Sequence, residues 1–213
     1  MNFRSLIPCA SLLLAVAAVA RAVCPSNHMQ AGSTIADSSL PADASSGGGC
    51  NPYGCTSSSV SYDIPHAGLS LRTSVSGDAG AYAKLTVQDD FRLIGLAPGG
   101  SAALIVRLQV NSLYCVATLR DANGHELSGA GDYDNNNVAL SLPITAVEDQ
   151  PFRLQFELVG YGDYFTGGAY GSGVFSFDGV PGGAAIVSCN GYVSDITVPV
   201  RTTSWGKLKS MYH

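Results

Sequence analysis

Several side chains with oxygen ligands follow one another in segment 131–137, which reads Gly-Asp-Tyr-Asp-Asn-Asn-Asn. Asp132, Asp134 and Asn136 occupy alternate positions, as at the start of a D-x-D-x-N calcium loop, and calcium binds about six to eight oxygens. We therefore treat them as candidate calcium ligands. The pattern is incomplete, because the sixth position is not Gly and the twelfth is Pro143 rather than Glu. A plain turn rich in Asp and Asn is the simpler interpretation.

Four aromatic side chains crowd the Gly-rich segment 160–173. They are Tyr161, Tyr164, Phe165 and Tyr170. Rigid aromatic faces on a flexible segment are typical of surfaces that bind sugars or peptides, because such contacts cost little conformational entropy. These four residues are our candidate ligand-binding residues. The simpler interpretation is that the rings cover the open end of a β-fold.

Motifs for catalysis are incomplete in this chain. His125 begins an H-E-x-x-H zinc motif, but Gly129 stands where the second His belongs. Ser172 is not in a G-x-S-x-G nucleophile elbow. Asp89 and Asp90 are adjacent, so on a strand they face opposite sides and do not form a glycosidase carboxylate pair. The sequence favours a non-catalytic binding or surface-structural module, with a secreted hydrolase acting on glycans as the alternative.

The elements that must position these residues are β-strands. Segment 81–110 predicts three successive strands: 81–88 alternates apolar and polar residues, 91–96 is an apolar run after Asp89 and Asp90, and the last strand, with apolar residues in phase over 104–110, follows an Ala-Pro-Gly-Gly turn. Segment 152–158 alternates apolar and polar residues throughout, and the chain has only three lysines and three glutamates to fill helix surfaces. We predict an all-β fold, a single antiparallel β-sandwich of jelly-roll or Ig-like type with about ten strands.

The chain divides into four segments. Residues 1–22 have a positive start, a short apolar run and an Ala-Arg-Ala cleavage motif, which predict a signal peptide removed at about Ala22. Residues 23–59 are rich in Ser and Gly and predict a loosely attached arm. The sandwich is expected over 60–200 and a tail over 201–213. We therefore expect a protein that is secreted, periplasmic or at the cell surface, with no membrane span.

The net charge of −5 argues against nucleic acid as a partner, because nucleic acids reward basic patches. We expect an extracellular glycan or protein as the partner, and no cofactor other than the candidate calcium ion.

Five cysteines remain after removal of a signal peptide. Cys115 and Cys189 both fall on the inward phase of strands that are far apart in sequence, which predicts a bridge across the core in an exported protein. Two separate buried thiols are the alternative. Cys50 and Cys55 are predicted to bridge locally, which leaves Cys24 single; Cys24 paired with one of them is the other arrangement.

The C-terminal segment changes character after Val200. It contains Trp205, Leu208 and Tyr212 in the pattern W-G-x-[LIV]-K-x-x-Y. This ending and the run 175–192 resemble exported bacterial β-sandwich proteins, many of them uncharacterised. The resemblance covers about forty residues. It implies export from a bacterium and names no activity.

If the Asp132 loop binds calcium, millimolar calcium should raise the melting temperature, because the ion binds only the folded state. The Asp132→Ala variant should lose this shift. Differential scanning fluorimetry with calcium and with chelator measures both. An unchanged melting temperature at millimolar calcium would remove the site.

Overall fold

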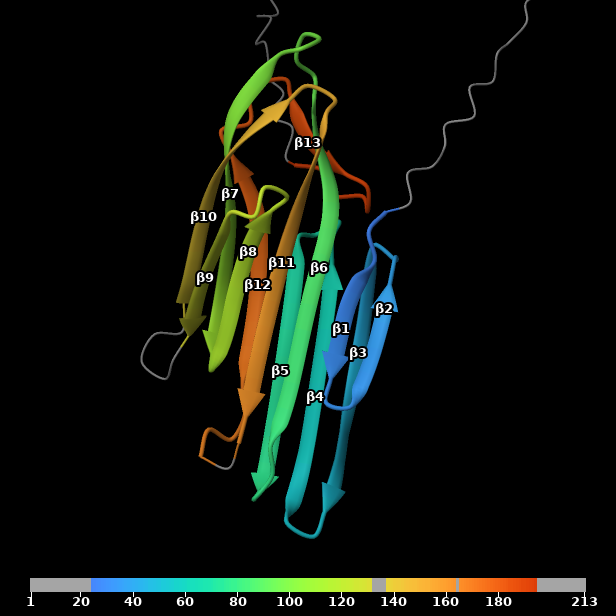
Figure 1. Cartoon of the computed structure of the whole chain (residues 1–213), viewed down its shortest axis with the longest axis vertical. Coiled ribbons are helices and arrows are strands. Elements are labelled where there is room, and N and C mark those ends of the chain that lie inside the picture. The colour runs from blue at the N-terminus through green and yellow to red at the C-terminus, as the bar shows by residue number, and fades with distance from the viewer. Residues whose placement is uncertain (1–23, 132–136, 164, 195–213) are drawn as a thin grey trace, which may run out of the picture.

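The chain forms two antiparallel β-sheets packed face to face (Figure 1). The computed structural model describes residues 24–131, 137–163 and 165–194, which contain thirteen strands. The predicted all-β antiparallel sandwich is confirmed, but the predicted number of about ten strands is too low. Within these ranges no helix has the length and apolar character needed to cross a membrane.

The seven-stranded sheet has the order β2-β1-β6-β11-β8-β9, with β13 also paired to β6. Its strands are β1 (Asn27–Ala31), β2 (Thr34–Ser38), β6 (Ala81–Ile94), β8 (Cys115–Asp121), β9 (Glu126–Gly131), β11 (Pro151–Gly162) and β13 (Ala185–Ser188). The six-stranded sheet has the order β10-β7-β12-β5-β4-β3. Its strands are β3 (Ala42–Asn51), β4 (Gly54–Asp63), β5 (Gly68–Gly77), β7 (Ser101–Leu113), β10 (Asn137–Val147) and β12 (Tyr170–Asp178).

Strands β5 to β12 follow a jelly-roll topology. They pair in a nested way, β5 with β12, β6 with β11, β7 with β10 and β8 with β9. Successive pairs of this nested set lie in alternate sheets, as in a double-sheet jelly roll. The topology therefore decides between the two sandwich types that the sequence left open. Strands β1 and β2 extend one sheet, and β3 and β4 extend the other.

Strand β6 is one continuous strand of 14 residues, where alternation predicted two strands separated at Asp89 and Asp90. Asp89 points inward and is buried, and Asp90 points outward, so the pair continues the alternation. Strand β11 pairs with β6 along its full length, from Pro151 opposite Arg92 to Gly162 opposite Ala81. These two long strands form the centre of the seven-stranded sheet.

The core lies between the sheets and contains a cluster of aromatic rings. Phe91 of β6 is fully buried, and its ring centroid lies 5.1 to 6.4 Å from those of Phe152, Phe156, Phe175, Phe177 and Tyr192. Burial of each large apolar side chain contributes about 1.5 to 3 kcal/mol. Because the rings come from both sheets, the cluster holds the sandwich together.

The segment expected to be a loosely attached arm instead forms strands in both sheets. Strand β1 pairs with β6, and β3 and β4 form a long hairpin beside β5. No residue of β3 is buried, which explains its linker-like composition. Small residues also permit close packing, because a Cβ on Gly47 would lie 2.2 Å from the carbonyl oxygen of Ala31. Strand pairing offsets the ordering entropy that the side chains do not.

The predicted Cys115–Cys189 bridge is wrong. Cys189 forms a disulfide with Cys24, and Cys115 is a buried free thiol. Cys189 donates its backbone N–H to the carbonyl oxygen of Asp90, whereas Cys115 lies two strands away at the level of Ala83. Seven residues along a strand and two strand spacings amount to more than about 20 Å, far beyond the reach of a disulfide.

The predicted Cys50–Cys55 disulfide is present and closes the end of the β3–β4 hairpin. Two disulfides indicate an oxidising environment of the extracellular type. The predicted signal peptide, the candidate calcium loop and the C-terminal tail lie outside the described residues.

A Cys24→Ser/Cys189→Ser variant should lose on the order of 4 to 5 kcal/mol of unfolding free energy, because this bridge spans 165 residues. The matched Cys50→Ser/Cys55→Ser variant opens a separation of only 5 residues and should lose about 2 kcal/mol. Guanidinium chloride unfolding of the three proteins measures both losses. Equal losses would contradict this ranking.

Candidate functional site

The aromatic side chains predicted to bind a ligand do not share one surface. Tyr161 lies near the end of β11 on the outer face of the seven-stranded sheet and is 56% exposed. Tyr170 begins β12 and points outward from the six-stranded sheet, on the opposite side of the sandwich. Phe165 is exposed in the turn between these strands. Tyr164 lies outside the described residues.

Tyr161 instead has Tyr82 as its aromatic neighbour. The two residues are directly opposite each other in the β6–β11 pairing, and both point to the outer face. Such residues have Cβ atoms about 4.5 to 5.5 Å apart. The hydroxyl of Tyr161 lies over Gly80, where an added Cβ would be 2.9 Å from it. Alternation predicts that Tyr82 points outward, but its pairing with Tyr161 is set by strand register.

Tyr82 and Gly80 contribute to the lining of a groove whose residues come from both sheets. The groove has a volume of about 520 Å³ and is bounded by the β1–β2 turn, the β3–β4 hairpin and the start of β6. Its polar lining residues are Gln30, Ser33, Asn51, Thr56, Ser58 and Tyr82, and glycine and alanine make up most of the rest. Gln30 and Tyr82 stand at outward positions of their strands. We call it the tyrosine groove.

The tyrosine groove exists because neighbouring strands end at different levels. Strand β1 pairs with β6 only over Ala83–Thr86, so Ala81 and Tyr82 extend past the end of β1. Across the gap, the hairpin contributes glycines together with Thr56 and Ser58. These small side chains leave open the space that large apolar side chains fill elsewhere in the core.

A second groove lies at the other end of β11, beside the β8–β9 turn. It has a volume of about 630 Å³ and receives residues from β7, β10 and β11. Its lining combines apolar side chains with charged ones, among them Leu104, Ile144, Phe152, Asp121, His125, Arg153 and Asp178. We call it the β8–β9 groove.

His125, which begins the incomplete zinc motif, lies in the β8–β9 turn. Its Nδ1 is 2.9 Å from Oδ2 of Asp121, whose Oδ1 accepts backbone N–H bonds from Asn123 and His125. Partial burial acts to raise the pKa of Asp121, but these hydrogen bonds and the imidazole together hold it below its ordinary value. The carboxylate therefore remains ionised and fixes the turn.

The described part of the chain contains no group of three His, Cys, Asp or Glu side chains placed to hold a metal ion. The candidate calcium ligands Asp132, Asp134 and Asn136 lie outside that part. The calcium site therefore stays a prediction.

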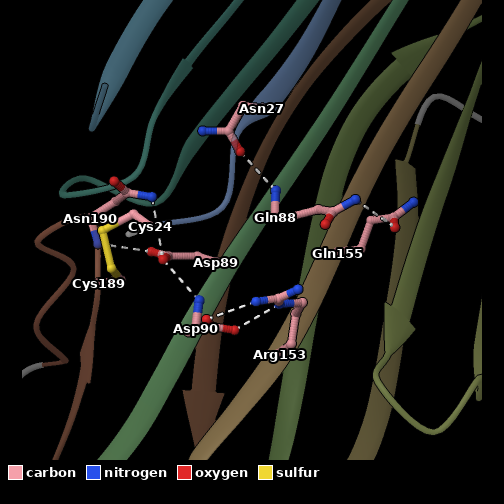
Figure 2. Close-up of polar contacts among 9 residues, drawn as sticks. All are labelled: Cys24, Asn27, Gln88, Asp89, Asp90, Arg153, Gln155, Cys189 and Asn190. Atoms are coloured by element: carbon pink, nitrogen blue, oxygen red, sulfur yellow. Dashed lines mark hydrogen bonds and ion pairs between the residues drawn. A yellow bond between two sulfur atoms is a disulfide. The ribbon is translucent and has the colours of Figure 1, made fainter. Parts of the chain in front are cut away.

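A buried polar cluster surrounds Asp89 next to the Cys24–Cys189 disulfide (Figure 2). Oδ1 of Asp89 accepts hydrogen bonds from the backbone N–H of Asp90 at 2.9 Å and from Nδ2 of Asn190 at 3.3 Å. Oδ2 accepts the backbone N–H of Asn190 at 3.3 Å. These bonds attach the turn after β13 to β6.

Asp89 occupies a gap along one edge of β6. Strand β1 pairs with β6 as far as Thr86, and β13 ends opposite Phe91. Asn27 closes the other side of the gap, where its Oδ1 accepts the backbone N–H of Gln88 at 2.8 Å (Figure 2). The side chains at the gap thus provide hydrogen bonds that a continuous strand ladder provides elsewhere.

The two adjacent carboxylates face opposite sides of the sheet and have different roles. Asp90 points outward and binds Arg153 through two hydrogen bonds of 2.7 and 2.9 Å (Figure 2). Burial raises the pKa of Asp89, although hydrogen bonds from Ser188, Asp90 and Asn190 oppose that shift. A raised pKa often marks a catalytic carboxyl. Here the carboxyl is fully buried, so it holds the turn in place and does not meet a polymer substrate.

No protein-family model and no curated protein matches the chain. One similar solved structure is the enzymatically active domain of bacteriophage CBA120 tailspike protein 4, at 16% identity and a TM-score of 0.31. The match covers 64% of this chain and 19% of the tailspike chain, so this chain spans about a fifth of it. Another is the carbohydrate-binding module TmCBM61 in complex with β-1,4-galactotriose, at 11% identity and a TM-score of 0.27, covering 64% of this chain and 88% of that one. Both similarities are distant.

The Asp89→Asn variant should show a weaker pH dependence of stability than the wild type. The pKa of Asp89 in the fold is raised above its ordinary value of 3.8, so its protonated form is favoured by folding. Its contribution to stability is therefore present below pH 3.8 and is lost as the pH rises through the raised value. Melting temperatures measured from about pH 4 to pH 7 should fall less steeply in the variant.

The control for this measurement is Asp149→Asn, which removes an exposed carboxylate that is ion-paired with Arg92. This variant should have nearly the wild-type melting temperature across the series, because an exposed ion pair contributes little to stability. A slope in Asp89→Asn equal to that of the wild type would rule out a role for Asp89 titration.

Proposed function

We propose that the protein is an exported, non-catalytic sandwich module that binds glycan chains in the tyrosine groove. The observation that carries this proposal is the composition of the groove, an uncharged set of residues with hydroxyl and amide groups that includes Tyr82, the cross-strand partner of Tyr161. Sugars present hydroxyl groups at their edges and C–H groups on their faces. Amides and hydroxyls match the former, and aromatic rings match the latter.

The groove is suited to a ligand in size and rigidity. Its volume of about 520 Å³ falls within the range of small-molecule sites. The Cys50–Cys55 disulfide closes the β3–β4 hairpin on one side. On the other, Gly32 donates its backbone N–H to the carbonyl oxygen of Tyr82 at 2.8 Å. A preformed site lowers the entropy cost of binding.

The carboxylates of the chain support binding over hydrolysis. Glycosidases use two carboxylates, about 5 to 9 Å apart, and one of them donates a proton. Within the part of the chain that the structure describes, neither Asp nor Glu lines the tyrosine groove. In the β8–β9 groove, Asp121 is hydrogen-bonded to His125, and Asp178 is ion-paired with Arg107. Because the pKa of Asp121 is lowered, this carboxylate is a poor proton donor.

A glycan array probed with the purified oxidised protein tests the proposal. We expect binding to at least one glycan. Tyr82→Ala and Tyr161→Ala should each weaken that binding by about tenfold or more, because each loses an aromatic contact of about 1.4 kcal/mol. Tyr170→Ala is the matched control, since Tyr170 is an exposed tyrosine on the opposite side of the sandwich.

The control should bind like the wild type. Circular dichroism of each variant establishes that the fold is intact. No binding to any glycan on the array, or an equal loss of glycan affinity in Tyr170→Ala and Tyr161→Ala, would contradict the proposal. Either result would favour a surface-structural protein with a protein partner.

A further inference from the structure

We infer that the tyrosine groove selects uncharged saccharide chains over chains that carry uronic acid or sulfate groups. This inference rests on the proposed function and goes further, because it names the chemical class of the ligand. It depends on the side chains that line the groove and on the charges around it.

Among the described residues, those that line the groove include no Asp, Glu, Lys, Arg or His. Nε2 of Gln30 donates to the carbonyl oxygen of Gly32, and Oδ1 of Asn51 accepts the backbone N–H groups of Tyr53 and Gly54. A sugar hydroxyl can therefore donate to Oε1 of Gln30, accept from Nδ2 of Asn51, or do either with the hydroxyl of Ser33. A carboxylate or sulfate in the same place would receive hydrogen bonds but no opposite charge. Removing an ionised group from water without a partner is costly, so the acidic ligand loses affinity.

Two basic side chains on the strands that border the groove are already paired. Lys84, two residues along β6 from Tyr82, lies 2.9 Å from Glu157. His28, two residues along β1 from Gln30, has its Nδ1 2.8 Å from Asp37. A bound anion would therefore have to compete with an existing carboxylate for either group.

The electrostatic field around the groove is also unfavourable to anions. Asp78 directly precedes the groove-lining segment 79–82, and it makes no ion pair within the described ranges. The whole chain carries a net charge of −5. Both features repel an acidic polysaccharide at low salt and leave a neutral one unaffected.

Matched hexasaccharides that differ only at C6 test this selectivity. The pairs are galactose with galacturonate, glucose with glucuronate, and mannose with mannuronate hexamers. By isothermal titration calorimetry at low salt, the best neutral hexamer should bind about tenfold or more tightly than its acidic partner, a difference of about 1.4 kcal/mol.

A positive charge introduced at the groove should change the ratio of the affinities for neutral and acidic hexamers. Gln30→Lys places a cation at a lining position and should reduce the preference for neutral over acidic hexamers about threefold or more, an effect that about 0.5 M salt removes. Gln155→Lys is the matched control. Gln155 lies on the outer face of β11, six residues from Tyr161, and this variant should leave the ratio unchanged.

The outcomes separate this inference from the function on which it rests. Acidic hexamers that bind as tightly as neutral ones, or a ratio that Gln30→Lys does not change, would overturn the selectivity and leave glycan binding intact. A complete lack of binding to neutral and acidic chains alike, here and on the array, would overturn both.

Discussion

β6 and β11 are hydrogen-bonded along their whole common length, and every other strand of the seven-stranded sheet attaches to one of them directly or through one neighbour. Their register brings Phe91 opposite Phe152 at one end, inside the aromatic cluster, and Tyr82 opposite Tyr161 at the other, outside it. A slip of one residue would turn the apolar side of the ladder to solvent. The same pairing therefore defines the core and sets the two tyrosines side by side.

Alternation of apolar and polar residues predicted strands correctly where a segment buries one side, as over 152–158. It gave the wrong strand boundaries where residues distant in sequence supply the contacts that stabilise a strand. A carboxylate at the inward position 89 suggested a break, because burial of a charge is unfavourable. Asn190, far away in sequence, supplies the hydrogen bonds that make Asp89 acceptable there. Segment 42–51 suggested a linker because it buries no side chain, yet pairing with β4 holds it as a strand.

The candidate site was visible in parts only. The sequence singled out Tyr161 and placed Tyr82 on an outward phase, but the groove beside them depends on where β1 ends, which no local pattern encodes. The cysteines show the same limit. The alternation of its strand correctly predicted that Cys115 points inward. Alternation does not show at which level of the sheet a residue lies, and Cys115 and Cys189 lie at different levels.

Cys24 and Cys189 lie close to the two ends of the described chain, so their bond makes nearly all of the sandwich one closed covalent loop. A pulling force applied on either side of this loop passes from one sulfur to the other and does not load the strands between them. While the bond is oxidised, the domain transmits tension without lengthening. Its reduction transfers the same force to the hydrogen bonds of the sheets, so the mechanical strength of the domain depends on the redox state of its surroundings.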